Sequence, residues 1–135
     1  MWERSPERDL RMTFDKHIGM VMGPDATPLT ASIRIEPHHC NPTGNINGGV
    51  IISLADNLST GAANRAYFDK TGERRFMVGV DLHAVMLTNQ QGGSIVATAH
   101  VVRAGRRITV IRTEVHGDND RLLAEITTTH VPMDG

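Results

Sequence analysis

The sequence has few of the features that mark disulfide-rich, membrane or nucleic-acid-binding proteins. Its 135 residues contain a single cysteine, Cys40, so no internal disulfide can form, and a lone thiol suits a reducing compartment. No apolar run approaches the roughly 20 residues that a transmembrane helix needs, and the segment MWERSPERDLRM is too charged for a signal peptide. The formal net charge of -1 lacks the basic excess typical of nucleic-acid binders. We therefore expect a cytoplasmic protein that binds neither membranes nor nucleic acids.

Length and hydrophobic pattern indicate one α+β domain over residues 1–135. Residues 1–16 are expected to form an N-terminal extension, helical or flexible, with a short surface helix over residues 6–16. Strands are predicted over residues 17–22, 29–36, 76–86, 94–103, 107–116 and 121–131, and the first two can pair as a hairpin while the last three form a meander.

One long helix is predicted over residues 48–67, after a loop rich in Pro, Gly and Asn. Its apolar residues cover most of the circumference, so we expect it to be buried on nearly all sides. The order of elements suits a curved antiparallel sheet of about six strands wrapped around this central helix. Because such a sheet leaves edge strands without cover, we expect a homo-oligomer, either a homodimer or a homotetramer.

The strand over residues 76–86 has a clear period of two. This alternation predicts that Gly79, Asp81 and His83 lie on one face. The opposite face is predicted to carry Phe76, Val78, Val80, Leu82, Ala84 and Met86.

The most informative motif places a Gly-Gly pair, Gly48 and Gly49, at the start of the long helix and a lone carboxylate, Asp56, inside its apolar run. An ionisable group there is costly to bury unless it is paired, hydrogen-bonded or lines a wet cleft. Two hypotheses follow. Asp56 is either a catalytic acid or base, or a buried carboxylate that structural partners satisfy.

Several segments together resemble the hotdog-fold acyl-CoA thioesterases, in particular the phenylacetate-pathway and human thioesterase superfamily member 2 type. The segments are Asn41 and Gly44, then NGGVIISLADNLSTGAA, MVGVDLHAVML and HVVRAGRRITVIRTEVHGDNDRLLAEITTTHV. The resemblance covers residues 17–133 and implies a hotdog fold. It also implies hydrolysis of an acyl or aryl thioester in a dimer whose active sites lie between subunits. No metal or redox cofactor is implied, since coenzyme A enters only as part of the substrate.

The resemblance assigns roles to residues near the helix start. Gly48, with Gly49 beside it, would offer a backbone N–H to polarise the thioester carbonyl, while Asp56 would act as general base or nucleophile. Along one helix Gly48 and Asp56 are roughly 12 Å apart at 1.5 Å per residue. The implied site therefore pairs Asp56 of one chain with Gly48 of its partner.

Two further residues have weaker assignments. The resemblance implies that Asn41 orients the water or the neighbouring loop. Thr60, one turn after Asp56, is placed to hydrogen-bond the carboxylate. The alternatives are a local turn at Asn41 and a threonine bonded to its own helix backbone.

The chain departs from the family pattern at two positions. Asn47 stands where these enzymes usually carry His, and Gly79 stands where some carry a Ser that assists the water. Asn keeps a donor and an acceptor but cannot titrate, and Gly79 supplies no hydroxyl. Asp81 and His83 can compensate or can be packing residues. These departures keep open a non-catalytic acyl-CoA-binding or sensing protein, and a hotdog hydratase or dehydratase is a further alternative.

The basic residues Arg103, Arg106 and Arg107 bracket a predicted hairpin turn. Guanidinium groups there can bind the phosphates of coenzyme A, or the turn can simply be solvated. The sequence leaves the acyl group open, as well as the carrier, which is either coenzyme A or acyl carrier protein. Adjacent His38, His39 and Cys40 lack the spacing of a zinc site.

Overall fold

The computed structural model describes residues 13–134. Two α-helices, α1 (Phe14–His17) and α2 (Gly48–Thr71), accompany six strands. The strands are β1 (Val21–Met22), β2 (Leu29–Arg34), β3 (Met77–Met86), β4 (Ser94–Ala104), β5 (Thr109–His116) and β6 (Leu122–Pro132). Short 3-10 turns, η1 (Pro37–His39) and η2 (Asp118–Asp120), lie in the connections.

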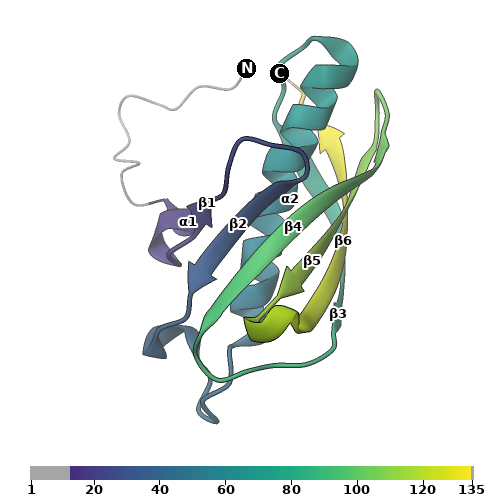
Figure 1. Ribbon diagram of the computed structural model, residues 1–135. Helices are drawn as coiled ribbons and strands as arrows, with labels where there is room; N and C mark the ends of the chain where they lie inside the picture. The colour runs from purple at the N-terminus through teal and green to yellow at the C-terminus, as the bar shows by residue number, and fades with distance from the viewer. Residues whose placement is uncertain (1–12, 135) are drawn as a thin grey trace.

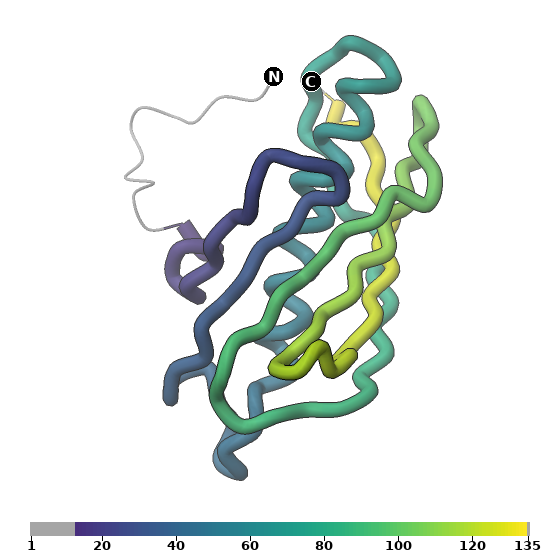
Figure 2. The backbone as a smooth tube through the Cα atoms, viewed as in Figure 1, coloured from purple at the N-terminus to yellow at the C-terminus, as the bar shows by residue number. Residues whose placement is uncertain are grey.

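All six strands form one antiparallel sheet in the order β1-β2-β4-β5-β6-β3. The sheet curves across α2, which lies along its concave face (Figure 1; Figure 2). The predicted α+β class, the first hairpin and the meander of the last three strands are confirmed. Strand β3 returns to pair with β6 and forms one edge of the sheet.

Of the two segments predicted near the N-terminus, the strand differs from the structure and the helix is largely untested. The strand expected over residues 17–22 is reduced to the two residues of β1, because the chain before it is helical in α1. The helix expected over residues 6–16 falls mostly outside the described residues, and its last part lies in α1.

Helix α2 begins and ends at defined caps. The side-chain oxygen of Asn47 accepts the Gly49 N–H at 2.8 Å, which satisfies one of the free donors of the first turn. At the other end Gly72 adopts a left-handed φ of 76° and its N–H binds the Phe68 carbonyl at 2.8 Å. The helix is 24 residues long and extends beyond the predicted end at residue 67.

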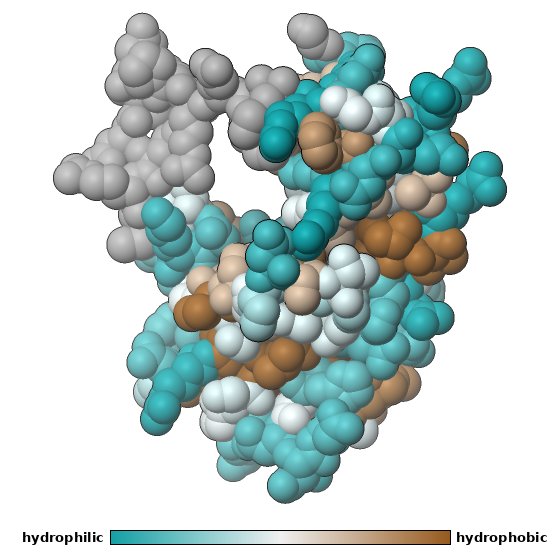
Figure 3. All heavy atoms as spheres, turned by 45° about the horizontal axis from the view of Figure 1, so that its top comes forward, coloured by the Kyte–Doolittle hydropathy of each residue, from teal (hydrophilic) through white to brown (hydrophobic). Residues whose placement is uncertain are grey.

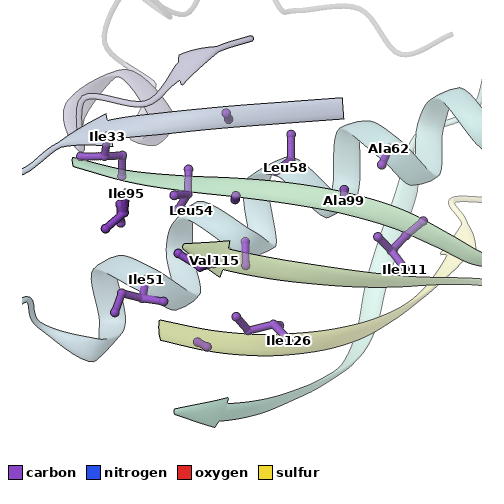
Figure 4. Packing of buried hydrophobic residues seen from close by; sticks show 14 of the residues in the cluster. Ile33, Ile51, Leu54, Leu58, Ala62, Ile95, Ala99, Ile111, Val115 and Ile126 are labelled. Carbon is purple, nitrogen blue, oxygen red and sulfur yellow. The ribbon is translucent and has the colours of Figure 1, made fainter. Parts of the chain in front are cut away.

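The core fills the space between α2 and the sheet. Figure 4 shows side chains of the helix facing side chains of the inner strands, and all of those labelled are buried or nearly so: Ile33, Ile51, Leu54, Leu58, Ala62, Ile95, Ala99, Ile111, Val115 and Ile126. Hydrophobic side chains also reach the surface, where the face in Figure 3 shows them as separate patches among hydrophilic ones.

The expectation that α2 is buried on nearly all sides is wrong for the single chain. Its buried residues recur three and four positions apart, as in Ile51, Leu54 and Leu58, and form one stripe against the sheet. Asp56 on another side is exposed, and Thr60 is only partly buried. The expectation failed because many of the apolar residues of α2 are small, and they do not form a second buried face.

A bulge changes which residues of β3 face the helix. Gly79 pairs with His130 and Asp81 pairs with Thr129, so Val80 has no partner position on β6. Leu82 therefore lies on the same face as Gly79, because its partner, Thr128, is buried like His130. The predicted alternation, which put Gly79 opposite Leu82, is wrong because an inserted residue shifts the register of side chains by one.

Candidate active site

Asp56 lies in a shallow hollow between α2 and the edge of the sheet. The hollow has a volume of about 330 Å³ and is lined by Asp56, Gly79, Val80, Asp81, Leu82 and Thr128. Asp56 is exposed, and within residues 13–134 no hydrogen bond or ion pair reaches its carboxylate. The single chain therefore does not bury or pair this carboxylate, as the structural hypothesis expected, and the Asp56 side chain is accessible from the hollow.

The predicted bond between Thr60 and the Asp56 carboxylate is also wrong. The Thr60 hydroxyl donates to the backbone carbonyl of Asp56 at 3.0 Å, and Ser59 donates to the same oxygen at 3.0 Å. Hydroxyls in a helix commonly bond the carbonyl one turn back. Thr60 thus bonds the backbone of Asp56 and not its carboxylate.

At the helix start, one of the two glycines has an available donor. The Gly49 N–H is already bound by the cap Asn47, whereas the Gly48 N–H has no acceptor among the described residues. A Cβ on Gly48 would lie 3.6 Å from the Met86 methyl group, so the last residue of β3 borders this position. Asn47 is anchored in turn, because its own N–H binds the His39 carbonyl at 2.9 Å. Asn47 therefore acts as the N-cap of α2.

Asn41 is held in a local turn of the loop before α2. Its side-chain oxygen accepts the backbone N–H of Thr43 at 2.9 Å and the Thr43 hydroxyl, which is an Asx turn. The loop is fixed from the other side by Asn89, whose side chain bonds both the N–H and the carbonyl of Ile46. Asn41 does not line the hollow that contains Asp56.

The sequence analysis missed His130 and Thr128, two buried polar residues of β6, of which Thr128 lines the hollow. The His130 ring has an exposed fraction of 0%, and its Nε2 lies 2.8 Å from the Thr128 hydroxyl. Burial lowers the pKa of His130 below its usual value, while the Met77 backbone and the Asp56 carboxylate act in the opposite direction. No atom of the described residues meets hydrogen-bond geometry with Nδ1. In the sequence, the one available signal of a shared face was that Thr128 and His130 are alternate residues of a predicted strand.

The three arginines lie at the far end of the molecule from Gly48. Arg103, Arg106 and Arg107 line a pocket of about 560 Å³ at the β4–β5 turn, together with Lys70 from the end of α2. Lys70 was not predicted to belong to this group. From Asp56 to Lys70 the helix spans roughly 21 Å at 1.5 Å per residue. The basic pocket and the hollow are therefore separate sites that share no lining residue.

Two negative findings apply to residues 13–134. No group of three or more His, Cys, Asp or Glu side chains is placed to hold a metal ion. Neither helix of this part of the chain is long and apolar enough to cross a membrane.

Comparisons of the sequence with known proteins agree on one family. A family model described as the thioesterase superfamily matches residues 43–124, which is more than half of the chain. A relative from Pseudomonas aeruginosa is 26% identical over 143 aligned positions, covering 100% of this chain and 97% of the relative. Human acyl-coenzyme A thioesterase 13 is 29% identical over 98 residues, covering 70% of this chain and 66% of that protein.

Solved structures share the fold. A thioesterase from Haemophilus influenzae superposes with a TM-score of 0.83 at 21% identity, covering 93% of this chain and 85% of that one. The Escherichia coli PaaI protein of the phenylacetic acid degradation operon has a TM-score of 0.78 at 20% identity, covering 90% and 84%. The expected hotdog fold is confirmed.

Proposed function

The chain belongs to the thioesterase superfamily, and from this premise we propose that it hydrolyses acyl-CoA thioesters to a free acid and coenzyme A, with Asp56 as the acting carboxylate. One observation carries the proposal: the Asp56 carboxylate is exposed and unpartnered within residues 13–134, in a hollow beside Gly79. A carboxylate without competing bonds can take a proton from water or attack a carbonyl carbon.

The second half of the site comes from another copy of the chain. Gly48 and Asp56 are roughly 12 Å apart along α2, too far to act on one carbonyl group. The Gly48 N–H at the positive end of the helix, free within residues 13–134, can stabilise the oxyanion of a thioester held by the partner's Asp56. Each dimer then contains two equivalent sites.

The β3 edge supports this dimer. Strand β3 is ten residues long and has no neighbour on one side within the described chain. Exposed apolar side chains crowd the same strand, with Val80 exposed by 58%, Val85 by 43% and Met86 by 44%. Long apolar edges are normally covered, and a second copy pairing along β3 would cover this one. The hollow at Asp56 and the Met86 end near Gly48 both lie on that edge.

The basic pocket is suited to bind coenzyme A. Lys70 and the three arginines offer several cationic donors for the phosphates of coenzyme A. Their separation of roughly 21 Å from Asp56 along the helix leaves room for the extended arm between the phosphates and the thioester. The test below separates coenzyme A from acyl carrier protein as the carrier.

The test is thiol release from short-chain, medium-chain and aryl acyl-CoA substrates, followed with a thiol-reactive dye. We expect steady turnover of at least one of them, faster than turnover of the same acyl group on acyl carrier protein. Saturable binding without turnover in the whole panel would instead support a non-catalytic acyl-CoA-binding protein. Reversible hydration of an enoyl-CoA without thiol release would support a hydratase.

A further inference from the structure

A second pocket lies on the other side of α2 from Asp56. It has a volume of about 520 Å³ and is lined by α2, the start of β2 and the end of β4, whereas the hollow at Asp56 is lined by α2, β3 and β6. The order of the sheet separates β2 and β4 from β6 and β3, and the two pockets share no lining residue. We call the second one the alanine pocket, after the four alanines that line it: Ala62, Ala66, Ala99 and Ala104.

The alanine pocket is open because one strand ends before its neighbour and small side chains line both walls. Strand β2 pairs with β4 only as far as Leu29 and Ala99, and β4 continues to Ala104. Beyond Ala99, no strand of the described chain lies on that side of β4. The helix contributes Ala62 and Ala66, and Figure 4 shows Ala62 and Ala99 at this end of the core. Alanines thus stand on both walls where larger side chains would fill the space.

The walls of the alanine pocket are long and mostly aliphatic. On α2 the lining runs from Ala62 to Lys70, which is roughly 12 Å at 1.5 Å per residue. Pro28, Leu29 and Val101 add further aliphatic surface, and no Phe, Tyr or Trp of the described chain lines the pocket. Small ligands typically occupy pockets of about 300–1,000 Å³ with apolar walls. An aliphatic chain suits these walls better than a flat ring, which commonly packs against aromatic side chains.

One end of the alanine pocket is positively charged. Lys70 and Ala104 line both this pocket and the basic pocket at the β4–β5 turn, so the two pockets adjoin there. Within residues 13–134, no hydrogen bond or ion pair engages the side chains of Lys70 and the three arginines of the basic pocket. Asp69 opposes this charge at the rim, and Arg65 is already paired with Asp25 at 2.9 Å. Four unpaired cations against one free carboxylate favour an anionic group at this end.

We propose that the alanine pocket is a second ligand site, which binds an unbranched aliphatic chain with an anionic head group. The chain lies along Ala62 and Ala66, and the head, a carboxylate or a phosphate, lies at the end where Lys70 borders the basic pocket. Because α2 separates this site from Asp56, the ligand is bound without being cleaved. The inference does not depend on the proposed hydrolysis.

The first test is calorimetric titration of the full chain with hexanoate, octanoate and decanoate. The affinity should rise about 4-fold for each added methylene group, because each one buries apolar surface. Decyl phosphate presents the other anionic head, and tighter binding of it than of decanoate would assign the head as a phosphate. Decylamine has the opposite charge and should bind about 10-fold more weakly than decanoate. Equal binding of decylamine and decanoate, or no binding of either anion, would overturn the inference.

Two substitutions locate the chain and its head. Ala66→Leu fills the pocket and should weaken decanoate binding by about 10-fold or more, while Ala66→Ser keeps the space and is the control. Leucine favours helix and fills a cavity, so the melting temperature of Ala66→Leu should not fall. Lys70→Gln should weaken binding of decanoate but not of decanol, which has no charge. Unchanged binding in Ala66→Leu would overturn the site, and equal losses for decanoate and decanol in Lys70→Gln would overturn the placement of the head.

Methyl NMR of protein labelled at alanine and leucine shows which pocket the chain occupies. Decanoate should shift the methyl signals of Ala62, Ala66, Ala99 and Ala104. Leu82 reports on the hollow at Asp56. A shift at Leu82 without shifts at the alanines would place decanoate only in that hollow and would overturn the inference. The measurement needs no turnover, so it decides the alanine pocket even if the wild type releases no thiol and the proposed hydrolysis fails.

Discussion

Gly79 and Asp56 line one hollow although they belong to different elements, the edge strand β3 and the central helix α2. The bulge at Val80 adds Leu82 to the same face as Gly79, and Leu82 lines the hollow too. Asp81 borders the same hollow and carries the same charge as Asp56. The two carboxylates provide a matched pair for mutagenesis, since only Asp56 is expected to act on substrate.

Asp56→Asn should reduce thiol release by about 10-fold or more, as expected for loss of a general base. The melting temperature should stay near that of the wild type, because no described residue bonds the carboxylate. Asp81→Asn is the control and should keep activity within about 3-fold, because a neighbouring charge acts only through a screened field. Equal rates in the wild type and Asp56→Asn would contradict the assignment. If Asp56→Asn does lose activity, single turnover in H₂¹⁸O tests for a nucleophile, because label appears in Asp56 when water attacks the Asp56 carbon of a covalent anhydride.

Much of the fold was predictable because its elements have strong periodic patterns. The helix start followed from the loop rich in Pro, Gly and Asn that ends at the Gly-Gly pair, and most strands followed from alternation. The bulge could not be predicted, because the residues 76–86 alternate without a break and only pairing with β6 reveals that Val80 is an extra residue. An error of one residue moved Gly79 and Leu82 to opposite faces.

The candidate site was predicted in position more than in contacts. Asp56 was singled out as a lone carboxylate in an apolar run and Gly79 as a departure from the family pattern, and the two line one hollow. The contacts of Asn41 and Thr60 were not predicted, because their side chains form hydrogen bonds with nearby backbone or hydroxyl groups. His130 escaped notice because its place on alternate residues of a predicted strand, the one available signal, does not say which face of the strand is buried.

Asn47→His should still fold but should change kcat or the preference among acyl groups. Replacing the cap acceptor should lower the free energy of unfolding by about 1 kcal/mol, measured by urea denaturation. Asn47→Asp keeps an acceptor for the Gly49 N–H and serves as the control for stability. An unchanged substrate panel in Asn47→His would show that this position affects only the cap.

Reversing charge in the basic pocket should weaken binding of coenzyme A and leave the chemical step intact. Arg106→Glu with Arg107→Glu should raise KM for acyl-CoA by about 10-fold, because charge-assisted phosphate bonds are lost, while kcat changes little. Arg34→Glu, on a strand outside this pocket, is the control. A short acyl-pantetheine thioester, which lacks the nucleotide, should show no difference between these proteins. A raised KM for that substrate too would point to a general effect on the fold.

The pH dependence of stability should carry a contribution from His130. Its pKa in the folded chain is lowered from 6.5 by burial, so between the two values the unfolded chain binds more protons than the folded one. Stability should therefore rise with pH as the solution passes from below the folded pKa to above 6.5. His130→Asn should remove this part of the slope, measured as melting temperature against pH. A slope that is identical in both proteins would show that other groups account for it.

Mixed dimers test whether one site is built from two chains. Gly48→Pro removes the backbone N–H at the first helical position, where proline is well tolerated, and Asn47 already has the extended ψ of 128° that a following proline favours. Gly48→Pro and Asp56→Asn should each be nearly inactive alone. Co-purified in equal amounts, half of the randomly paired dimers contain one chain of each kind. Such a dimer holds one intact site, which pairs the native Asp56 of one chain with the native Gly48 of the other, so the mixture should recover about a quarter of wild-type activity. A site contained within one chain would recover nothing, and size-exclusion chromatography with light scattering would confirm that the mixed sample is dimeric.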